Sequence, residues 1–371
     1  MRGVCALHRL AASRVLTPSG WRRDAHVVVD ADAGTIVAVE PAAGTTPDRV
    51  IAPGFVDLQV NGIDDVDCAR ADGADWDRLD ALLLAQGVTT WCPTLVTTAL
   101  DRYQAPLDRV AAAMARPCTA RPTIAGVHLE GPFLGGAPGA HPRQHIVPID
   151  LAWLRALPEH VAMVTLGPEQ PLAPDATRLL VERGVLVSVG HTTATHAEVD
   201  ATFAAGARMA THLFNAMTGL HHRTPGVAGA VLTHADACAS LIADGVHVHP
   251  QMLALAAAVL GPDRTILVTD AVAWRAGTAG SIGLELRDGA PRLPDGTLSG
   301  SALTMDAAVR TCVDAGIDLA HALRAASTVP ARVLGLDDRG RIEPGCRADL
   351  VALGQDLTVE QVLVAGVEAV G

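Results

Sequence analysis

Residues 185–213 read VLVSVGHTTATHAEVDATFAAGARMATHL, and they contain the pattern that recurs through most of this chain of 371 residues. A short apolar run at 185–190 precedes a segment of helical composition at 196–205, and a second apolar run follows at 207–213. Apolar strands that alternate with helices are typical of a parallel sheet covered by helices on both faces. This stretch therefore predicts an α/β fold built from repeated strand–helix units.

The same alternation begins at residue 55 and contains eight candidate strands. They are FVDLQV at 55–60, VTTWCPT at 88–94, TIAGVHLE at 123–130, VAMVTL at 161–166, VLVSVG at 185–190, ARMATHL at 207–213, ASLIA at 239–243 and TILVTD at 265–270. Eight such strands in about 215 residues fit a closed (β/α)8 barrel of the TIM type better than an open sheet.

The two ends of the chain have a different pattern. The runs at 26–30 and 35–40 alternate apolar and polar residues across a turn, which indicates an antiparallel sheet. The tail also reads as strands joined by turns, at 340–353 and 359–370, but it has too little apolar surface to fold alone. We therefore expect a small discontinuous β-sandwich domain built from both ends. The predicted division is 1–52 with 336–371 for this domain and 53–335 for the barrel.

The composition limits the classes of partner. The formal net charge is -12, which argues against nucleic acid or a membrane as the main partner. It leaves room for one small anionic ligand, because a site can hold local positive charge. Hydrophobic residues make up 49% of the chain but aromatic residues only 3%, so the core must consist mainly of Ala, Val and Leu.

All 28 basic residues are arginine, and the chain contains no lysine. This excludes a Schiff-base lysine and the lysine of a phosphate-binding P-loop. It also excludes a pair of metals bridged by a modified lysine. A metal site in this chain must therefore take any carboxylate ligand from Asp or Glu.

Cysteine usage and the N-terminal segment favour a cytoplasmic protein. The seven cysteines are scattered and form no C-x-x-C pair, which argues against a disulfide framework or a thiolate zinc site. The N-terminal segment is interrupted by His8, Arg9 and Arg14 and lacks a clean signal-peptide core. No apolar run approaches the roughly 20 residues of a membrane span.

Side chains suited to metal binding or proton transfer lie at the ends of the candidate strands. In a barrel these strand ends form one rim, so residues far apart in sequence converge there. A single histidine in an apolar segment is more often a core residue, but a purely structural reading becomes weak when many rim positions carry His, Glu or Asp. The rim residues are Asp57, Gln59, Asn61, His128, Glu130, His191, His212, His247, His249 and Asp270.

Glu130, His191 and His212 form the candidate metal set. Two neutral imidazoles and a carboxylate leave a fourth position for water, which is the pattern of a catalytic zinc site. A metal in such a site lowers the pKa of that water toward about 7. Asp270, at the end of the eighth strand, could then take the proton and pass it to a leaving group. The alternative for Asp270 is a helix cap or a turn residue.

Two loops extend this picture. The glycine-rich segment GGAPGAHP at 135–142 carries His141, and the segment at 211–226 carries Asn215, His221, His222 and Arg223. Arginine forks suit phosphate. The alternatives are an ordinary surface loop for His141 and a surface arginine for Arg223.

Six motifs, in order along essentially the whole chain, resemble the N-acetylglucosamine-6-phosphate deacetylase family of the amidohydrolase superfamily. The resemblance implies a metal-bearing barrel with a small β-domain, removal of acetyl from the 2-acetamido group of a sugar 6-phosphate, and a homodimer. The motifs are PGFVDLQVNG (53–62), GVHLEGPFL (126–134), SVGHTTAT (188–195), THLFNAM (211–217), LVTDA (267–271) and LSGSALTM (298–305).

The resemblance also implies roles for single residues. Glu130, His191 and His212 correspond to metal ligands, Asp270 to the acid/base, and His141 to the group that polarises the substrate carbonyl. In such enzymes the arginine that corresponds to Arg223 can reach across from the partner subunit. The implied sugar-phosphate contacts are Ala140, His141, Asn215, Ala216, Arg223 and His247, and the loop of Leu298, Ser299 and Gly300 is expected to cover the sugar.

The chain departs from this family in two places. Gln59 and Asn61 stand where many members have H-x-H. This second-metal or pocket position therefore lacks strong zinc ligands. We expect one divalent metal per chain, zinc in the first place, with iron, cobalt or manganese compatible with the ligands. Asp64, Asp65 and Asp67 replace glycines beside the expected pocket. Either they face solvent, or they weaken phosphate binding and point to a different N-acyl amino sugar.

The sequence thus predicts hydrolysis of N-acetylglucosamine-6-phosphate to glucosamine-6-phosphate and acetate. The nearest alternative is the same chemistry on N-acetylgalactosamine-6-phosphate or on an unphosphorylated N-acyl amino sugar. A remote alternative is a non-catalytic binding protein that has kept the barrel.

Overall fold

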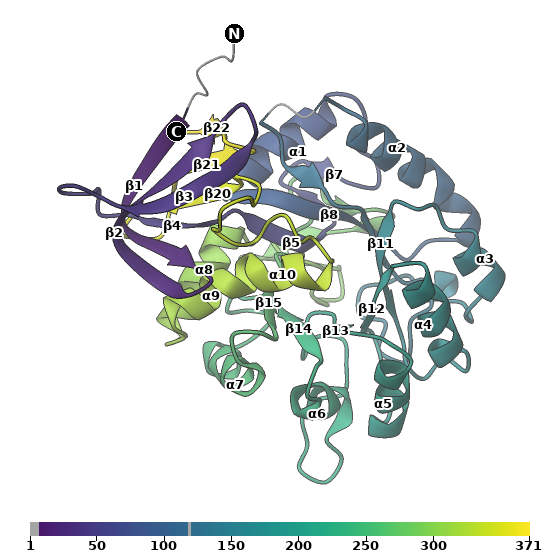
Figure 1. Cartoon of the computed structure of the whole chain (residues 1–371). Helices are drawn as coiled ribbons and strands as arrows, with labels where there is room; N and C mark the ends of the chain where they lie inside the picture. Colours follow the sequence, from purple (N-terminus) through teal and green to yellow (C-terminus); the bar gives the residue numbers. More distant parts are fainter. Residues whose placement is uncertain (1–6, 118–119) are drawn as a thin grey trace.

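The computed structural model describes residues 7–117 and 120–371, and its centre is a barrel of eight parallel strands (Figure 1). The strands hydrogen-bond in chain order, and the ring is closed by a parallel bridge between Val60 and Ala271. All eight strands predicted from the sequence are present. They are β5 (Phe55–Val60), β8 (Val88–Val96), β10 (Val127–Glu130), β11 (Val161–Leu166), β12 (Leu186–Val189), β13 (Met209–Ala210), β14 (Cys238–Leu241) and β15 (Thr265–Leu267), and a short β9 (Thr123–Ile124) pairs with β8.

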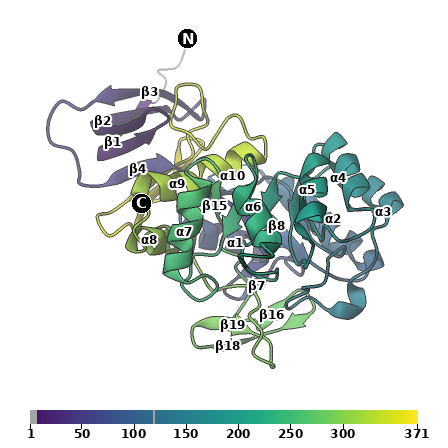
Figure 2. The same ribbon diagram turned by 90° about the horizontal axis from the view of Figure 1, so that it is seen from below.

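Helices surround the barrel and bury the outward side chains of the strands (Figures 1 and 2). They are α1 (Asp75–Leu84), α2 (Gln104–Met114), α3 (Leu151–Arg155), α4 (Ala173–Glu182), α5 (His196–Ala204), α6 (Gly226–Thr233), α7 (Pro250–Leu260), α8 (Met305–Asp314), α9 (Leu319–Ala326) and α10 (Thr328–Val333), with 3₁₀ turns at Leu100–Arg102 and Arg143–His145. None of those in the described residues is long and apolar enough to cross a membrane.

The barrel interior is layered along its axis. Cys92, Met163, Leu186, Met209 and Cys238 pack together with residues of α10, which closes one end. Successive residues of a strand alternate between its two faces, so the next inward positions lie two residues further on. These positions carry hydroxyl groups and are all buried: Thr94, Thr165, Ser188, Thr211 and Ser240. The change from apolar to polar side chains along each strand prepares a polar mouth at the carboxyl end.

Both ends of the chain contribute to a second sheet, as the sequence predicted. Its seven strands follow the order β22-β21-β20-β4-β1-β2-β3. Val50, Ala52 and Val351 on one face join the barrel core, and Ile51 and Leu350 on the other face join a separate core. The strands are β1 (Leu7–Thr17), β2 (Gly20–Asp30), β3 (Thr35–Pro41), β4 (Val50–Pro53), β20 (Leu350–Leu353), β21 (Val359–Val364) and β22 (Val367–Val370).

This sheet curls around its own core. Thr35, at the start of the edge strand β3, bridges to Arg347, and the Ala348 N–H donates to the Gly34 carbonyl at 2.9 Å. The start of β3 therefore contacts the segment that leads into β20, in keeping with the expected sandwich-like domain. The division of the chain after residues 52 and 335 stays a prediction, and residues 1–6 of that range lie outside the described residues.

The segment between β15 and α8 contains two small hairpins that the sequence did not predict. Their strands have only two or three residues each, too few for a periodic pattern to be recognised. They project from the barrel on the side away from β1–β3 (Figure 2). The strands are β16 (Thr278–Ala279), β17 (Ile282–Gly283), β18 (Glu285–Arg287) and β19 (Ala290–Arg292), and a further short pair is β6 (Gly62–Ile63) with β7 (Val66–Asp67).

Asp57 gives a stability prediction. Burial raises its pKa to about 7, although the Thr269 hydroxyl and two backbone N–H groups donate to the carboxylate. The folded state therefore favours the protonated form, and this contribution to stability is lost as the pH rises from about 4, the usual pKa of Asp, through 7. The free energy of unfolding of Asp57→Asn, measured with urea, should therefore rise relative to that of the wild type when the pH is raised from 5 to 8. An equal difference at both pH values would contradict this reading.

Candidate metal and catalytic site

A cavity of about 400 Å³ opens at the carboxyl ends of the barrel strands. Most of the predicted site residues line it, although they come from six separate strand ends and loops. Gln59 lies beneath the cavity wall, and Arg223 does not line it. The lining includes Asn61, Glu130, Ala140, His141, His191, His212, Asn215, Ala216, His247, Asp270, Leu298, Ser299 and Gly300, together with Arg292.

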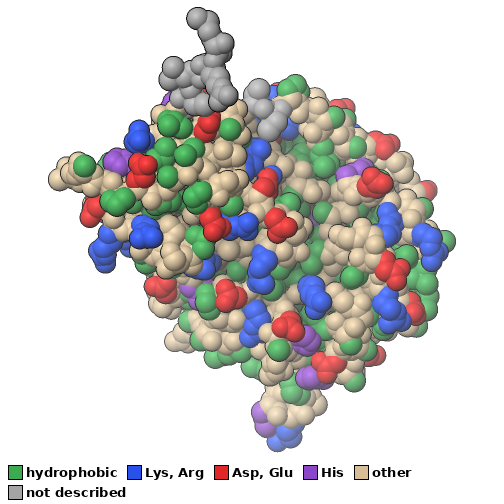
Figure 3. Space-filling model, in the orientation of Figure 1, with side chains coloured by type: hydrophobic (Ala, Val, Ile, Leu, Met, Phe, Trp, Pro, Cys, Tyr) green, Lys and Arg blue, Asp and Glu red, His purple; other side chains and the backbone are tan. Residues whose placement is uncertain are grey.

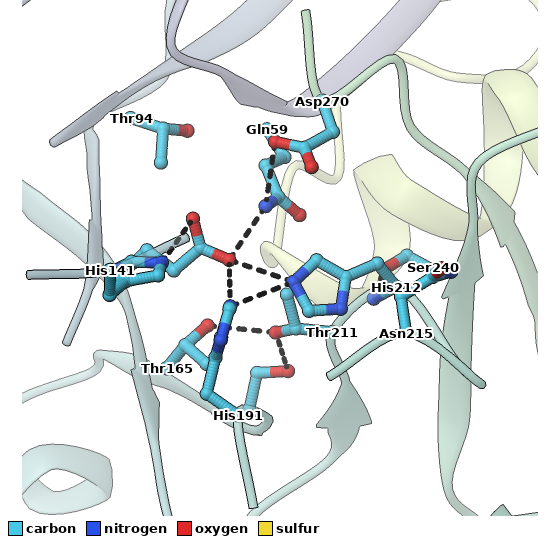
Figure 4. A network of polar contacts seen from close by, with 12 residues as sticks. Gln59, Thr94, His141, Thr165, His191, Thr211, His212, Asn215, Ser240 and Asp270 are labelled. Atoms are coloured by element: carbon cyan, nitrogen blue, oxygen red, sulfur yellow. Dashed lines mark hydrogen bonds and ion pairs between the residues drawn. The ribbon is translucent and has the colours of Figure 1, made fainter. Parts of the chain in front are cut away.

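Glu130, His191 and His212 lie together in the wall of this cavity; Figure 4 shows His191 and His212. The Glu130 Oε1 atom lies 3.0 Å from His191 Nε2 and 2.9 Å from His212 Nε2. The two Nε2 atoms are 3.0 Å apart. Glu130 ends β10, whereas each histidine stands two residues beyond its strand, β12 or β13. The barrel thus unites three ligand groups in one buried triangle.

The electrostatics of the triangle call for a cation. His191 Nδ1 lies 3.1 Å from the Pro138 carbonyl, which can only accept, so Nδ1 carries the proton and Nε2 presents a lone pair. Burial, followed by the neighbouring His141, lowers the pKa of His191 to about 4, so the ring is neutral. A lone pair 3.0 Å from a carboxylate oxygen is repulsive unless positive charge lies between them. These residues therefore fit a divalent metal ion.

The pKa values of Glu130 and His212 are shifted by the same group of buried charges. Burial alone would raise the pKa of Glu130, but its contacts with His141, His191 and His212 outweigh burial and hold the pKa well below its usual range. Burial opposes protonation of His212, yet the Glu130 and Asp270 carboxylates raise its pKa. Both pKa shifts therefore follow from the charges that the buried groups exert on one another.

Three residues of the site have unusual backbone conformations. His191, His212 and Asp270 have φ values of 49°, 35° and 48°, in the left-handed region that side chains other than glycine rarely adopt. Such conformations cost about 1–3 kcal/mol each and persist where surrounding contacts enforce them. The Ser240 hydroxyl accepts the His212 N–H at 2.8 Å, and the Gln59 carbonyl accepts the Asp270 N–H at 2.9 Å. These turns direct the side chains into the mouth of the barrel.

Asp270 has the properties of a proton carrier. It is 7% exposed, and burial together with the Glu130 charge raises its pKa to about 8. The amide groups of Gln59 and Asn61 donate to its Oδ1 atom at 3.1 and 2.6 Å. Gln59 also donates to Glu130 at 2.9 Å and so bridges the two carboxylates. In this structure both amides orient carboxylates.

His141 presents a donor to the cavity. The Thr97 N–H lies 3.3 Å from His141 Nδ1, and the Thr97 hydroxyl lies 2.8 Å from the same atom. Because a backbone N–H can only donate, Nδ1 is the acceptor and the neutral ring carries its proton on Nε2. This Nε2 lies 3.6 Å from Glu130 Oε2. Sequence reasoning missed Thr97, which sits at the end of β8 without a diagnostic motif.

The loops after β13, β14 and β19 form the part of the cavity wall beyond the triangle of Glu130, His191 and His212. His247 is held by Asp244, whose Oδ2 accepts from Nδ1 at 2.6 Å, and its side chain is buried. Ala216 is tied to the loop after β12, because its carbonyl accepts the Thr192 N–H at 3.0 Å. Gly300 has φ +62°, and a Cβ there would lie 2.3 Å from the Val272 side chain, so only glycine fits this covering loop.

The three acids near the pocket do not line the cavity. Asp64 pairs with Arg78 at 3.0 Å and with Arg275 at 2.8 Å. Asp65 is exposed and pairs with the same Arg78. Asp67 is buried and accepts from the Thr278 hydroxyl and the Gly280 N–H. Their presence therefore gives no argument against a phosphorylated ligand.

Beneath the triangle, His128 belongs to a buried hydrogen-bonded layer. Its Nε2 lies 2.8 Å from the Thr165 hydroxyl, which lies 2.8 Å from that of Thr211, and Ser188 lies 2.6 Å from Thr211 (Figure 4 shows Thr165 and Thr211). Burial lowers the pKa of His128 to about 4, so it is neutral. Neighbouring strands are thereby linked directly below the ligands.

The outer surface offers no comparable concentration of charge on the face seen in Figure 3. Acidic and basic side chains are interspersed there among apolar ones.

Residues 50–369 match the model of the amidohydrolase family, and the chain belongs to this family. Within it, the chain is 38% identical to an N-acetylgalactosamine-6-phosphate deacetylase of Escherichia coli O157:H7, covering 97% of this chain and 98% of that protein. It is also 38% identical to an N-acetylglucosamine-6-phosphate deacetylase of Bos taurus, over 85% of this chain and 82% of that protein.

Solved structures of two relatives share the whole fold. The N-acetylglucosamine-6-phosphate deacetylase of Thermotoga maritima superposes with a TM-score of 0.90 at 33% identity, covering 98% of this chain and 99% of that one. A mutant of the Mycobacterium smegmatis enzyme, in complex with N-acetyl-D-glucosamine-6-phosphate, gives a TM-score of 0.89 at 32% identity, covering 98% of this chain and 100% of that one. The resemblance predicted from six motifs is confirmed.

Proposed function

We propose that this chain removes the acetyl group from an N-acetylated amino-sugar 6-phosphate, with N-acetylglucosamine-6-phosphate as the first candidate. The products would be glucosamine-6-phosphate and acetate. The observation that carries the proposal is the buried triangle of Glu130, His191 and His212 with the Asp270 carboxylate and the His141 Nε2 atom beside it. The relatives named above act on such sugars, which supports the same class of substrate here.

Glu130, His191 and His212 would hold one divalent metal ion, which we propose to be zinc. Iron, cobalt and manganese also accept this mixture of oxygen and nitrogen ligands. When bound, the ion supplies Lewis acidity to water and to the carbonyl oxygen. Gln59 and Asn61 support a single ion, since their amide nitrogens are engaged with carboxylates.

Asp270 would transfer the proton, and His141 would stabilise the negative charge on the carbonyl oxygen. Asp270 accepts a proton from water as the water oxygen bonds to the acetamide carbon. The His141 Nε2–H donates to the carbonyl oxygen as negative charge develops there. Asp270 then returns the proton to the amine nitrogen while the C–N bond breaks. The free amino sugar and acetic acid result, and the acid releases its proton to solvent to become acetate.

Asn215, Ala216 and His247 are proposed to hold the sugar phosphate, with Ala140 beside the acetamido group and Leu298, Ser299 and Gly300 over the sugar. Arg223 lies in an exposed loop before α6 and outside the cavity of its own chain. We propose that it reaches the neighbouring active site of a homodimer. A cytoplasmic location would suit such an enzyme.

A second candidate substrate is N-acetylgalactosamine-6-phosphate, because a relative with this activity matches nearly the full length of the chain. The test is a deacetylation screen over both 6-phosphates and over free N-acetylglucosamine, with the metal quantified. Turnover of a 6-phosphate supports the proposal, and the ratio between the two assigns the epimer. Turnover of the free sugar alone would replace the proposed substrate, and a bound metal without hydrolysis would favour a binding protein.

Asp270→Asn should retain the metal but lose about 10³-fold or more in kcat, because the amide cannot accept the proton from water. Metal content and steady-state kinetics measure the two effects separately. Asp64→Asn, which alters an acid outside the cavity, serves as the control and should keep its activity. Turnover near the wild-type level in Asp270→Asn would exclude the assigned role.

Metal analysis of the fully active protein should give one equivalent of divalent ion per chain. Glu130→Gln should lose most of this ion, since it removes the charged ligand from the triangle. Equilibrium dialysis with zinc measures the affinity without relying on activity. Two tightly bound equivalents per chain would show that Gln59 and Asn61 do not prevent a second site.

Arg223→Ala should raise KM for a phosphorylated sugar by about 10-fold or more, because a charged hydrogen bond contributes about 1.5–3 kcal/mol. The kinetics of free N-acetylglucosamine should not change. Analytical ultracentrifugation should show a dimer in both proteins. A monomeric and fully active wild type would rule out a contribution across subunits.

A further inference from the structure

Arg292 is the one arginine among the described residues that line the active-site cavity. It ends β19, in the short hairpin that the sequence did not reveal, and it shares the cavity with Asn215, Ala216 and His247. No role follows for it from the motifs of the chain. Its position nevertheless places a permanent positive charge at the wall of the cavity that contains these three residues.

The hairpin holds Arg292 in place. Arg292 bridges to Leu298, the Leu293 N–H donates to the Thr297 carbonyl at 2.8 Å, and the Ser299 N–H donates to the Pro291 carbonyl at 3.1 Å. The arginine is therefore joined through the backbone to the loop of Leu298, Ser299 and Gly300. A cation on such a support is positioned before the ligand arrives, which lowers the entropic cost of binding.

The guanidinium has unused donors. Its Nη1 atom donates to the Gly296 carbonyl at 2.9 Å, and no carboxylate in residues 7–117 or 120–371 pairs with it. A guanidinium carries five N–H donors in a planar fork that suits phosphate oxygens. Many other arginines of this acidic chain are engaged with Asp or Glu. Arg292 keeps its charge uncompensated within a cavity that already contains Glu130 and Asp270.

We propose that Arg292 binds the phosphate of the substrate from within the same chain and thereby determines the preference for phosphorylated amino sugars. This inference rests on the proposed function. It differs from the expectation for Arg223, because that residue lies outside the cavity and needs a partner subunit. Arg292 would add a cation of the same chain to the phosphate contacts of Asn215, Ala216 and His247.

The simpler reading is that Arg292 only braces the hairpin through Gly296. Arg287 provides a matched control, since it lies on the paired strand β18, donates to the Leu293 and Pro294 carbonyls, and does not line the cavity. A bracing role predicts similar consequences for both arginines. A phosphate-binding role predicts consequences for Arg292 alone.

The experiment compares Arg292→Gln, Arg292→Lys and Arg287→Gln in the metal-loaded enzyme. Arg292→Gln should lower kcat/KM for N-acetylglucosamine-6-phosphate by about 10- to 100-fold, mainly through KM, and leave free N-acetylglucosamine unchanged. Arg292→Lys should recover part of the loss, and Arg287→Gln should resemble the wild type. An equal loss with both sugars, or no loss with either, would overturn the proposal.

Binding of glucose 6-phosphate separates this inference from the proposed function. The probe has the phosphate but no acetamido group, and calorimetry measures its affinity without turnover. If the wild type hydrolyses no N-acetyl sugar, the proposed function fails, but weaker binding of the probe to Arg292→Gln than to Arg287→Gln still supports the anion site. Equal affinity of the wild type, Arg292→Gln and Arg287→Gln for glucose 6-phosphate would refute the anion site.

Discussion

The meeting of one carboxylate and two imidazole nitrogens within 3.0 Å is the interaction on which the rest of the site depends. Glu130, His191 and His212 come from three separate strands, and only closure of the barrel brings them together. Their lone pairs and negative charge cannot share this small buried space without a cation. The polar layer below, the strained turns after the strands and the amides of Gln59 and Asn61 all act to hold these groups in position.

The absence of lysine explains much of this arrangement. Barrels that bridge two metals with a modified lysine are excluded for this chain, and the carboxylate comes instead from Glu130 on β10. Gln59 donates to both Glu130 and Asp270 and separates two negative groups that would otherwise repel each other. The proposed chemistry thus requires one metal ion in the triangle and one proton carrier beside it. Arginine is the only side chain of this chain that can offer a permanent positive charge to a phosphate.

The sequence predicted the strands well and the short segments poorly. The predicted strands at 55–60 and 161–166 coincide with β5 and β11, because burial on both faces gives a mainly apolar signal. The rim residues were predicted because catalytic groups follow strand ends in such barrels, and most of them line the cavity. Thr97, Asp244 and Arg292 were missed, since each acts through a contact with a residue distant in sequence or through a hairpin too short to recognise. The acids at 64–67 left two readings open. Ion pairs of Asp64 and Asp65 with arginines and the hydrogen bonds of Asp67 removed the objection to phosphate.

The sequence by itself determined the fold class, the participation of both chain ends in one small sheet, and the family, because these depend on periodicity and on motifs of contiguous residues. It also determined which residue types were available for chemistry. Only the tertiary structure decided which nitrogen of His191 and His141 carries the proton, how Asp270 comes to be buried beside Glu130, and which arginine faces the cavity. These properties depend on distances between atoms far apart in the chain and on their removal from water, and neither is encoded in any local stretch of sequence.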